Sequence, residues 1–201
     1  MNCIILGDRY YKGMKSKGCP ALIKKDLKSP VILDTQFKVL TERFKPDNIV
    51  YVYGFDSKRF LSHISKNEHF KLVTVFNDQY DYKNIGYSLS LVDTFLCDNT
   101  LIVGGYNLVS KSMFKNLNID HSNILVSDNS ESSVGCVINN GYVENISYDL
   151  NNKLCNIFYL TKSVAINLKN KLSNSKYHNA FLFEILNDMI DDGIKLMCHK
   201  V

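Results

Sequence analysis

A short apolar segment near the start of the chain leads into three residues that could bind phosphate. Cys3–Leu6 is followed directly by Gly7, Asp8 and Arg9. A glycine lets backbone N–H groups approach a phosphate closely, and an arginine supplies a permanent positive charge. The same residues also suit a plain strand-to-loop turn that Asp8 caps, so on their own they leave both interpretations open.

A lysine-rich segment, residues 12–28, follows this turn. Lys17 and Lys24 could reach a triphosphate held there and neutralise the charge that develops during transfer. Because the net charge of the chain is only +4, a phosphate-facing or solvated loop explains these lysines better than a nucleic-acid groove does. The candidate catalytic cations are therefore Arg9, Lys17 and Lys24.

Polar residues and glycines at two further places could hold a nucleotide. Asn84 and Ser88 flank the start of a predicted helix, where they could contact a nucleotide or only cap the helix. Gly104, Gly105 and Tyr106 follow a predicted strand and suit either a remodelled ligand pocket or a packed remnant of one. The predicted nucleotide-binding residues are Gly7, Asp8, Asn84, Ser88 and Gly105.

Other chemically capable residues have weaker patterns. Asp128 and Glu131 could supply a metal ligand from a polar loop or lie in solvent, and the acids at 188–192 could mark an interface or a solvated helix end. The five histidines lack ligand spacing, and the six cysteines lack C-x-x-C pairs and read as small buried hydrophobes. Several tyrosines could stack a base or simply pack: Tyr10, Tyr11, Tyr51, Tyr53, Tyr80, Tyr82, Tyr87 and Tyr106.

Strands and helices alternate through the first half of the chain. Apolar β-branched segments predict strands at 3–6, 48–53, 71–76 and 100–103, and helical spacing predicts helices at 31–44, 57–64 and 86–96. This alternation indicates βαβ units and a parallel sheet. Ligands bind such sheets at the carboxyl ends of the strands, so the expected crevice lies between the loops that follow Leu6 and Val103.

The second half has a different character. Strands are predicted at 123–126, 134–138, 142–147, 154–160 and 194–198, and helices at 163–172 and 179–191. Asn139-Asn140-Gly141 predicts a hairpin turn, because Asn and Gly tolerate positive φ. No linker rich in Gly, Pro or Ser divides the halves, so we expect one domain over residues 1–201.

Composition limits the class of protein. Hydrophobic residues make up 45% and charged residues 22% of the chain, which excludes a disordered protein. No apolar segment reaches the roughly 20 residues that a membrane helix needs, and no basic leader precedes the first apolar segment. We expect a soluble, cytoplasmic protein without a membrane partner, or a virion protein if a phage encodes it.

Three segments, taken in order, carry a resemblance. Gly7–Arg9 with Gly13-Met14-Lys15-Ser16 and Pro20-Ala21-Leu22, then residues 77–91, then residues 101–106 resemble the nucleotidyltransferase family, whose first motif runs G-x-G-x-R-M and P-K-A-L. The resemblance implies an α/β fold, a Rossmann-like GT-A nucleotidyltransferase sandwich with a mostly parallel central sheet and a β-hairpin in the second half. It also implies enzymes that join a nucleoside triphosphate to a phosphorylated small acceptor with Mg²⁺, releasing pyrophosphate.

The sequence departs from this pattern at the positions that carry the chemistry. Gly13 stands where the family has arginine, no lysine separates Pro20 from Ala21, and Tyr106 stands at the place of the metal-binding aspartate. A phenol is a poor Mg²⁺ ligand, because Mg²⁺ prefers hard anionic oxygens. We therefore expect impaired or lost catalysis, with Mg²⁺ as the cofactor only if the protein is active. The alternative is an inactive scaffold that binds protein partners in a larger assembly, for example a phage particle.

Overall fold

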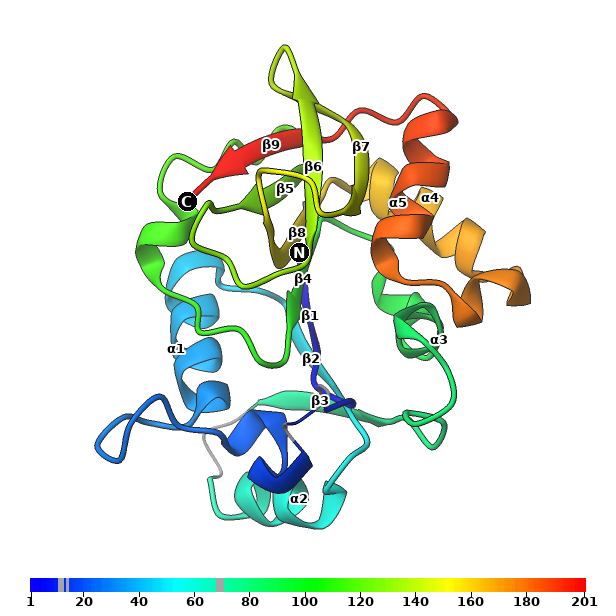
Figure 1. The fold of residues 1–201 in the computed structure, drawn as a ribbon. Coiled ribbons are helices and arrows are strands. Elements are labelled where there is room, and N and C mark those ends of the chain that lie inside the picture. Colours follow the sequence, from blue (N-terminus) through cyan, green and yellow to red (C-terminus); the bar gives the residue numbers. More distant parts are fainter. Residues whose placement is uncertain (11–12, 14, 68–70) are drawn as a thin grey trace.

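A computed structural model describes residues 1–10, 13, 15–67 and 71–201, which form a sheet with helices on both faces (Figure 1). Tyr11, Met14 and His69, which the sequence motifs include, lie outside these residues. The strands are β1 (Asn2–Leu6), β2 (Asn48–Tyr53), β3 (Leu72–Phe76), β4 (Thr100–Gly104), β5 (Asn123–Val126), β6 (Val134–Asn139), β7 (Tyr142–Tyr148), β8 (Leu154–Leu160) and β9 (Met197–Lys200). The α-helices are α1 (Ile32–Phe44), α2 (Ser57–Ser65), α3 (Ile85–Ser90), α4 (Lys162–Leu172) and α5 (Leu182–Asp191).

The strand order within this single sheet is β3-β2-β1-β4-β8-β5-β9-β7-β6. The predicted parallel arrangement holds for β1 to β4, since β1 runs parallel to β2 and β4, and β2 runs parallel to β3. However, β8 is antiparallel to both β4 and β5, and β6 and β7 form an antiparallel hairpin. The sheet is thus mixed, and the prediction of a mostly parallel sheet is wrong. The apolar pattern of β8 predicted a strand but carries no information about its direction.

Three predicted elements differ by more than one residue at a boundary. The helix predicted at 86–96 is shorter, because α3 ends at Ser90 and a 3₁₀ turn at Asp93–Phe95 follows it. The helix predicted from 179 begins at Leu182, where the Glu184 side chain accepts a hydrogen bond from the Phe181 N–H. The last strand runs over Met197–Lys200 instead of 194–198. Helix and strand ends depend on such local contacts, which hydrophobic spacing does not reveal.

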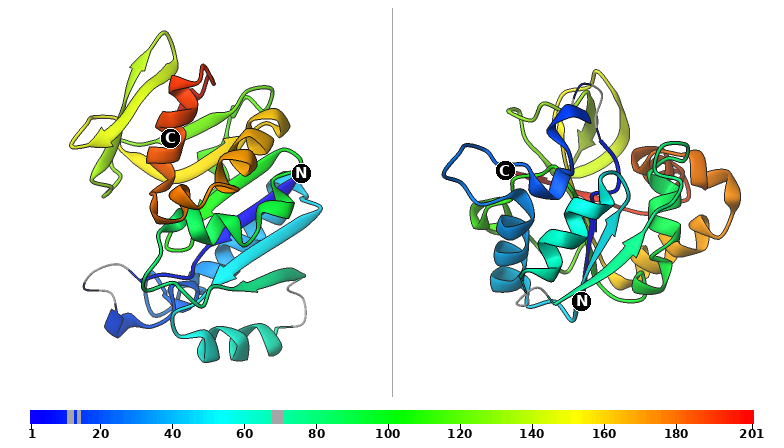
Figure 2. Two further views of the ribbon diagram at one scale, coloured as in Figure 1. Left: turned by 90° about the vertical axis from the view of Figure 1, so that its right-hand side faces the viewer. Right: turned by 90° about the horizontal axis from the view of Figure 1, so that it is seen from below.

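Alternate side chains of the central strands face two separate cores, as the two-residue period of a strand requires. Ile4 and Leu6 lie in the core that includes residues of α3, α4 and α5. Cys3 and Ile5 lie in the core beneath α1 and α2. Figure 1 shows α1 on one side of the sheet and α3, α4 and α5 on the other. The hairpin β6–β7 projects at the end of the sheet opposite β3 (Figure 2).

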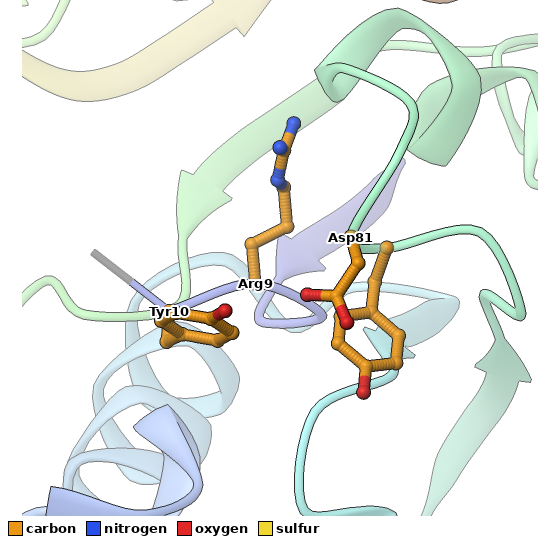
Figure 3. A pocket seen from close by; sticks show the side chains of 4 residues that line it. Arg9, Tyr10 and Asp81 are labelled. Atoms are coloured by element: carbon orange, nitrogen blue, oxygen red, sulfur yellow. The ribbon is translucent and has the colours of Figure 1, made fainter. Parts of the chain in front are cut away.

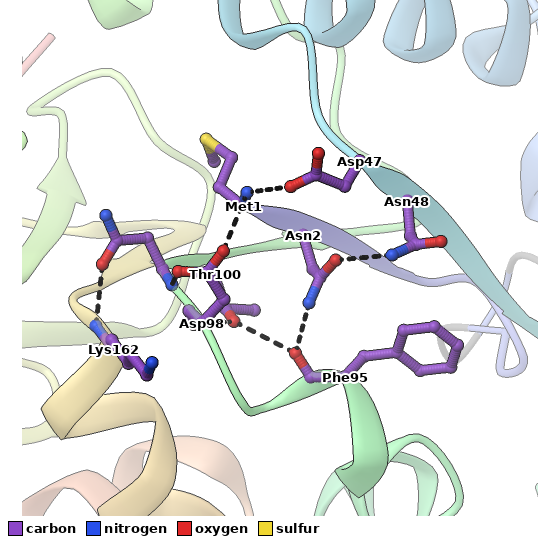
Figure 4. Close-up of polar contacts among 9 residues, drawn as sticks. Met1, Asn2, Asp47, Asn48, Phe95, Asp98, Thr100 and Lys162 are labelled. Carbon is purple, nitrogen blue, oxygen red and sulfur yellow. Dashed lines mark hydrogen bonds and ion pairs between the residues drawn. The ribbon is translucent and has the colours of Figure 1, made fainter.

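Polar contacts fix the amino ends of the central strands (Figure 4). Asn2 donates to the Phe95 carbonyl over 2.8 Å and accepts a hydrogen bond from Asn48 over 2.9 Å. Thr100 Oγ1 donates to the carbonyl of Asp98 over 2.8 Å. These bonds tie β1 to β2 and to the turn before β4, so they fix the amino ends of the three strands relative to one another. Within the described residues, no helix has both the length and the apolar character needed to cross a membrane.

Candidate functional site

The loops after β1, β3 and β4 meet at the carboxyl ends of the parallel strands, and a buried cluster lies at their centre. Asp8 Oδ2 accepts hydrogen bonds from Asn77 Nδ2 and Ser88 Oγ, each over 2.8 Å. Asn77 also binds the Gln79 N–H through its Oδ1 over 2.8 Å. All three side chains are buried, Asp8 with 2% exposure and the other two with none. The cluster therefore joins β1, the loop after β3 and α3 from within.

Asp8 does not present its charge at the mouth of the site. Burial raises the pKa of its carboxyl above the ordinary value of 3.8, and the hydrogen bonds from Ser88 and Asn77 only partly oppose that rise. The sequence analysis named Asp8 and Ser88 as nucleotide-binding residues, and in the structure they contact one another although they are 80 residues apart in the chain. In the structure, however, Ser88 Oγ is directed at Asp8 and is buried.

Arg9 and Asn84 form the more exposed part of the predicted set. Arg9 donates a hydrogen bond of 2.8 Å to Asn84 Oδ1, and Asn84 Nδ2 donates to the Asn179 carbonyl over 2.6 Å. Asn84 is the residue before α3, but its side chain makes no capping hydrogen bond to that helix. Of the two interpretations of Asn84, helix capping is therefore excluded, and its side chain instead orients Arg9.

A pocket of about 260 Å³ lies beside Arg9, lined by Arg9, Tyr10, Tyr80 and Asp81. Figure 3 shows these side chains around it, with the guanidinium of Arg9 directed away from Tyr10 and Asp81. The Tyr10 ring packs on Phe55 with centroids 4.6 Å apart. Partial desolvation and the nearby Asp81 carboxylate raise the pKa of the Tyr80 phenol. The pocket thus combines a cation, two aromatic rings and a carboxylate.

A lysine that the sequence did not single out as a candidate lies beside this pocket. Lys15 Nζ lies 5.2 Å from the centroid of the Tyr10 ring, within cation–π range. Lys17 shares a 3₁₀ turn with Lys15 and is exposed. Lys24 is exposed and pairs through its backbone with Val31. The described contacts thus bring Lys15, but neither Lys17 nor Lys24, to a residue that lines the pocket.

The loops after β1 and β4 touch through two glycines. Gly105 donates a hydrogen bond of 2.8 Å to the Leu6 carbonyl, and a Cβ atom added at Gly105 would overlap the Cα of Gly7. A Cβ at Gly7 would in turn overlap the hydroxyl of Tyr51. That hydroxyl is buried and has no hydrogen-bond partner among the described residues. Gly7 and Gly105 therefore lack side chains for a packing reason, and no side chain fits at position 105.

The loop after β4 is held from both sides. Gln36, a buried residue of α1, donates to the carbonyls of Gly104 and Asn107 over 3.0 and 2.9 Å. Asn107 Nδ2 donates to the carbonyls of Cys155 and Asn156 in β8, over 2.5 and 3.1 Å. These bonds make the loop a packed part of the structure, which favours the second interpretation of Gly104, Gly105 and Tyr106.

The described residues do not fit a protein-held Mg²⁺ at these loops. Mg²⁺ requires carboxylate oxygens that face a ligand, together with phosphate oxygens and water. Asp8 is turned inward, position 105 has no room for a side chain, and Asp81 is the one carboxylate that lines the pocket beside Arg9. Nowhere in the described residues do three or more His, Cys, Asp or Glu side chains gather as a metal site.

The other acidic candidates take structural partners or lie apart. Asp188 accepts a 2.8 Å hydrogen bond from the Tyr177 hydroxyl, and Asp192 pairs with Lys171 over 2.6 Å. These contacts join α5 to α4 and to the turn between them, and they offset the unfavourable position of acids at a helix C-terminus. Among the cysteines, the prediction of buried positions is correct for Cys3, Cys19 and Cys136 but wrong for Cys97, which is exposed.

Sequence reasoning missed several residues that shape this site. Asn77 and Asp81 were included only as members of the segment 77–91, and Gln36 was not singled out. A polar residue on the apolar face of α1 was the available signal for Gln36, because a buried amide needs hydrogen-bond partners. No comparable signal exists for Asp81, since exposed loop acids are common.

These features define a class of fold, and comparison with solved structures names it. No protein-family model matches the sequence, and no curated protein sequence matches it. Many solved structures do match, with nucleotidyltransferases among them, so the predicted nucleotidyltransferase fold is confirmed.

Three of these structures illustrate the similarity. CTP:phosphocholine cytidylyltransferase from Streptococcus pneumoniae has 19% identity and a TM-score of 0.81, covering 100% of this chain and 89% of its own. The inositol-1-phosphate CTP transferase from T. maritima has 15% identity and a TM-score of 0.76, with 99% and 84% coverage. A nucleoside-diphosphate-sugar pyrophosphorylase from Vibrio cholerae RC9 has 9% identity and a TM-score of 0.74, with 100% and 92% coverage. At these identities the similarity is one of fold.

Proposed function

We propose that this protein binds a nucleoside triphosphate and a phosphorylated small acceptor at the carboxyl ends of the parallel strands, with nucleotidyl transfer impaired or lost. The observation that carries the binding proposal is the pocket beside Arg9, in which a cation, two tyrosine rings and a carboxylate converge. It lies at the carboxyl ends of the parallel strands, the edge at which such sheets bind ligands, but between the loops after β1 and β3, to one side of the crevice expected between β1 and β4. We also propose that residues 1–201 form one domain, since strands from both halves share one sheet.

The chemistry of each lining residue indicates which part of a nucleotide it would contact. Arg9 keeps further N–H donors for phosphate oxygens while one binds Asn84. Lys15 adds a second positive charge next to Tyr10. The rings of Tyr10 and Tyr80 offer faces for a base, and Asp81 can accept hydrogen bonds from sugar hydroxyls. At about 260 Å³ the pocket holds part of a nucleotide, and the remainder would lie along its open mouth.

The proposal of impaired transfer rests on Asp8 and Gly105. Nucleotidyl transfer needs metal ions and cations that neutralise the charge on the transferring phosphate. Asp8 is buried against Ser88 and Asn77, Gly105 contacts Gly7, and Tyr106 stands at the place that the resemblance gives to the metal-binding aspartate, so none of these positions supplies a carboxylate to a bound nucleotide. Binding without efficient turnover is the behaviour that this arrangement supports.

Calorimetric titration with CTP, UTP, ATP and GTP, each with and without Mg²⁺, tests the binding proposal. We expect binding of at least one nucleotide by the wild-type protein and a clear loss of affinity in Arg9→Gln. A pyrophosphate-release assay with phosphocholine or glucose 1-phosphate as acceptor tests the second part. Slow or absent release supports impaired transfer, whereas release at rates typical of enzymes, about 1–1,000 per second, contradicts it.

A second candidate function, an inactive scaffold in a larger assembly, is favoured by one exposed edge of the sheet. β3 is an edge strand, and its Val73 and Phe76 side chains are 38% and 50% exposed. Unpaired edge strands with apolar side chains favour pairing with other chains. Light scattering on the purified protein distinguishes the candidates. A defined oligomer that dissociates on Phe76→Lys, together with no nucleotide binding, supports the scaffold.

A further inference from the structure

The segment that follows β2 contacts the loop after β1 from outside the pocket. Phe55 donates its backbone N–H to the Asp8 carbonyl over 2.8 Å, and its ring packs on Tyr10 at 4.6 Å. The next residue, Asp56, reaches further along the same loop. We call the three residues Phe55, Asp56 and Arg59 the clasp, because each of them contacts residues of that loop.

Asp56 is the centre of the clasp. Its Oδ2 accepts a hydrogen bond of 3.1 Å from the Cys19 N–H and another of 3.2 Å from Arg59. Asp56 adopts a left-handed backbone conformation, with φ of 54°, which is uncommon for a residue with a side chain. This strain at the start of α2 directs the carboxylate toward residues 18 and 19, and it is maintained by the contacts that the carboxylate makes.

Gly18 permits this close approach. It has a φ of 78°, and a Cβ atom added there would overlap the guanidinium of Arg59. The chain at Gly18 thus lies directly against the clasp, and Cys19, which follows, is buried. The position requires glycine both for its backbone conformation and for the space it leaves.

Lys15 is tied to the clasp through a short turn. The Gly18 N–H donates to the Lys15 carbonyl over 3.2 Å, so the turn at Lys15–Lys17 continues directly into the gripped residues. The other end of the Lys15 side chain lies over Tyr10, whose ring rests on Phe55 of the same clasp. Both the backbone and the ammonium group of Lys15 are therefore placed by residues 55–59.

We propose that Asp56 is a positioning residue for nucleotide binding. It does not line the pocket; it holds the turn that carries Lys15, so that this ammonium group lies over the Tyr10 ring beside the pocket, where nucleotide phosphates can reach it. This inference rests on the proposed function. The inference adds to that function by assigning part of the nucleotide affinity to Asp56, whose carboxylate would repel a triphosphate if the two were in direct contact.

Two substitutions of Asp56 separate positioning from folding. Asp56→Gly keeps the left-handed backbone without strain and removes the carboxylate, whereas Asp56→Asn tolerates the same backbone and keeps a hydrogen-bond acceptor. Asp34→Asn is the matched control, because Asp34 also contacts α2, through His63 over 2.9 Å, yet contacts no described residue of the turn at 15–19.

Trypsin cleavage after Lys15 and Lys17, followed by mass spectrometry, reports whether the clasp holds the turn. Calorimetry with CTP and with inorganic tripolyphosphate reports affinity.

If Asp56 positions Lys15, trypsin cleaves Asp56→Gly faster than the wild type, and the variant binds both probes at least about fivefold more weakly. A fivefold change is the low end of the range for energetic coupling between two sites. Its binding also becomes less sensitive to salt, since one cation no longer contributes. Asp56→Asn restores most of the affinity, and Asp34→Asn behaves as wild type. Faster cleavage with unchanged affinity and salt dependence overturns the inference, as does equal loss in Asp34→Asn. If the wild-type protein binds neither probe, the proposed function fails, and cleavage unchanged by Asp56→Gly shows separately that the clasp itself is absent.

Discussion

Gly105 packs against Gly7 so closely that a Cβ atom on Gly105 would overlap the Cα of Gly7. This contact joins the loops after β1 and β4 at the point where the fold would place a ligand. It explains why the glycines occur there, and it removes the space in which an acidic side chain could stand. The remaining chemistry of the site lies to one side, at Arg9 and its pocket.

The first prediction concerns the contact between the two glycines. Gly105→Ala should destabilise the protein by about 1–3 kcal/mol, the usual cost of overpacking a core. Gly104→Ala is the neighbouring control, because its Cβ would meet only the Asn107 and Asn156 side chains, at 3.3–3.4 Å. Chemical denaturation measures both variants. Equal stability of Gly105→Ala and the wild type would show that the loops separate easily.

The second prediction concerns the pH dependence that Asp8 introduces. Its folded pKa is raised by burial, so its contribution to stability is fully present below the unfolded pKa and is lost as pH rises through the folded pKa. Asp8→Asn removes this titration and keeps an acceptor for Ser88 and Asn77. Relative to the wild type, Asp8→Asn should therefore gain stability as pH rises from about 4 toward 7.

Denaturation of Asp8→Asn and wild type across this pH range provides the measurement. Asp8→Ala is the control, because it leaves two buried donors without an acceptor and should lose stability at every pH, by about 1–3 kcal/mol for each unsatisfied donor. A constant stability difference between Asp8→Asn and the wild type would show that Asp8 does not titrate as its burial implies.

The third prediction concerns the unpartnered hydroxyl of Tyr51. This hydroxyl is buried without a hydrogen bond to any described residue, and burial raises the pKa of the phenol well above its ordinary value. Tyr51→Phe should leave stability unchanged or raise it by about 1 kcal/mol, because it removes an unsatisfied polar group.

Tyr159→Phe is the matched control, since the Tyr159 hydroxyl donates to the Ile119 carbonyl over 3.1 Å. Loss of that bond should lower the free energy of unfolding by about 0.5–1.5 kcal/mol. If Tyr51→Phe is destabilised as much as Tyr159→Phe, the Tyr51 hydroxyl has a partner, such as a buried water, and the packing account of Gly7 needs revision.

The fourth prediction ranks the positive side chains. Arg9→Gln should weaken nucleotide binding most, since Arg9 lines the pocket and is oriented by Asn84. Lys15→Gln should have a smaller effect, because Lys15 does not line the pocket but lies over the ring of Tyr10, which does. Lys17→Gln and Lys24→Gln should have little effect, because no described contact brings either side chain to a residue that lines the pocket. Calorimetric affinities for one nucleotide give the order. A larger loss in Lys17→Gln or Lys24→Gln than in Lys15→Gln would reverse the assignment.

The sequence predicted the parallel half of the fold well, and the bounds of β2 agree residue for residue. Apolar β-branched runs bounded by proline and glycine are strong local signals there. It also assigned Asp8, Asn84 and Ser88 to one nucleotide-binding set, through the resemblance to nucleotidyltransferases. The sequence could not predict the direction in which the Asp8 side chain points. Whether Asp8 faces the mouth or the interior depends on Asn77 and Ser88, and those contacts arise only when three loops meet.

The same limit applies to the choice among lysines. Lys15, Lys17 and Lys24 are equivalent in sequence, and the clasp at Asp56 alone distinguishes Lys15 by gripping Gly18 and Cys19. The sequence also could not predict that β8 runs antiparallel between β4 and β5, because the direction of a strand in a sheet depends on its tertiary pairing.

The most direct test of the central claim is calorimetric titration of the wild-type protein and Arg9→Gln with CTP, UTP, ATP and GTP. We expect the wild type to bind at least one of them, and Arg9→Gln to bind it much more weakly while unfolding at the same temperature. Absence of binding by the wild type to all four nucleotides, with and without Mg²⁺, would contradict the claim that this fold retains a nucleotide site.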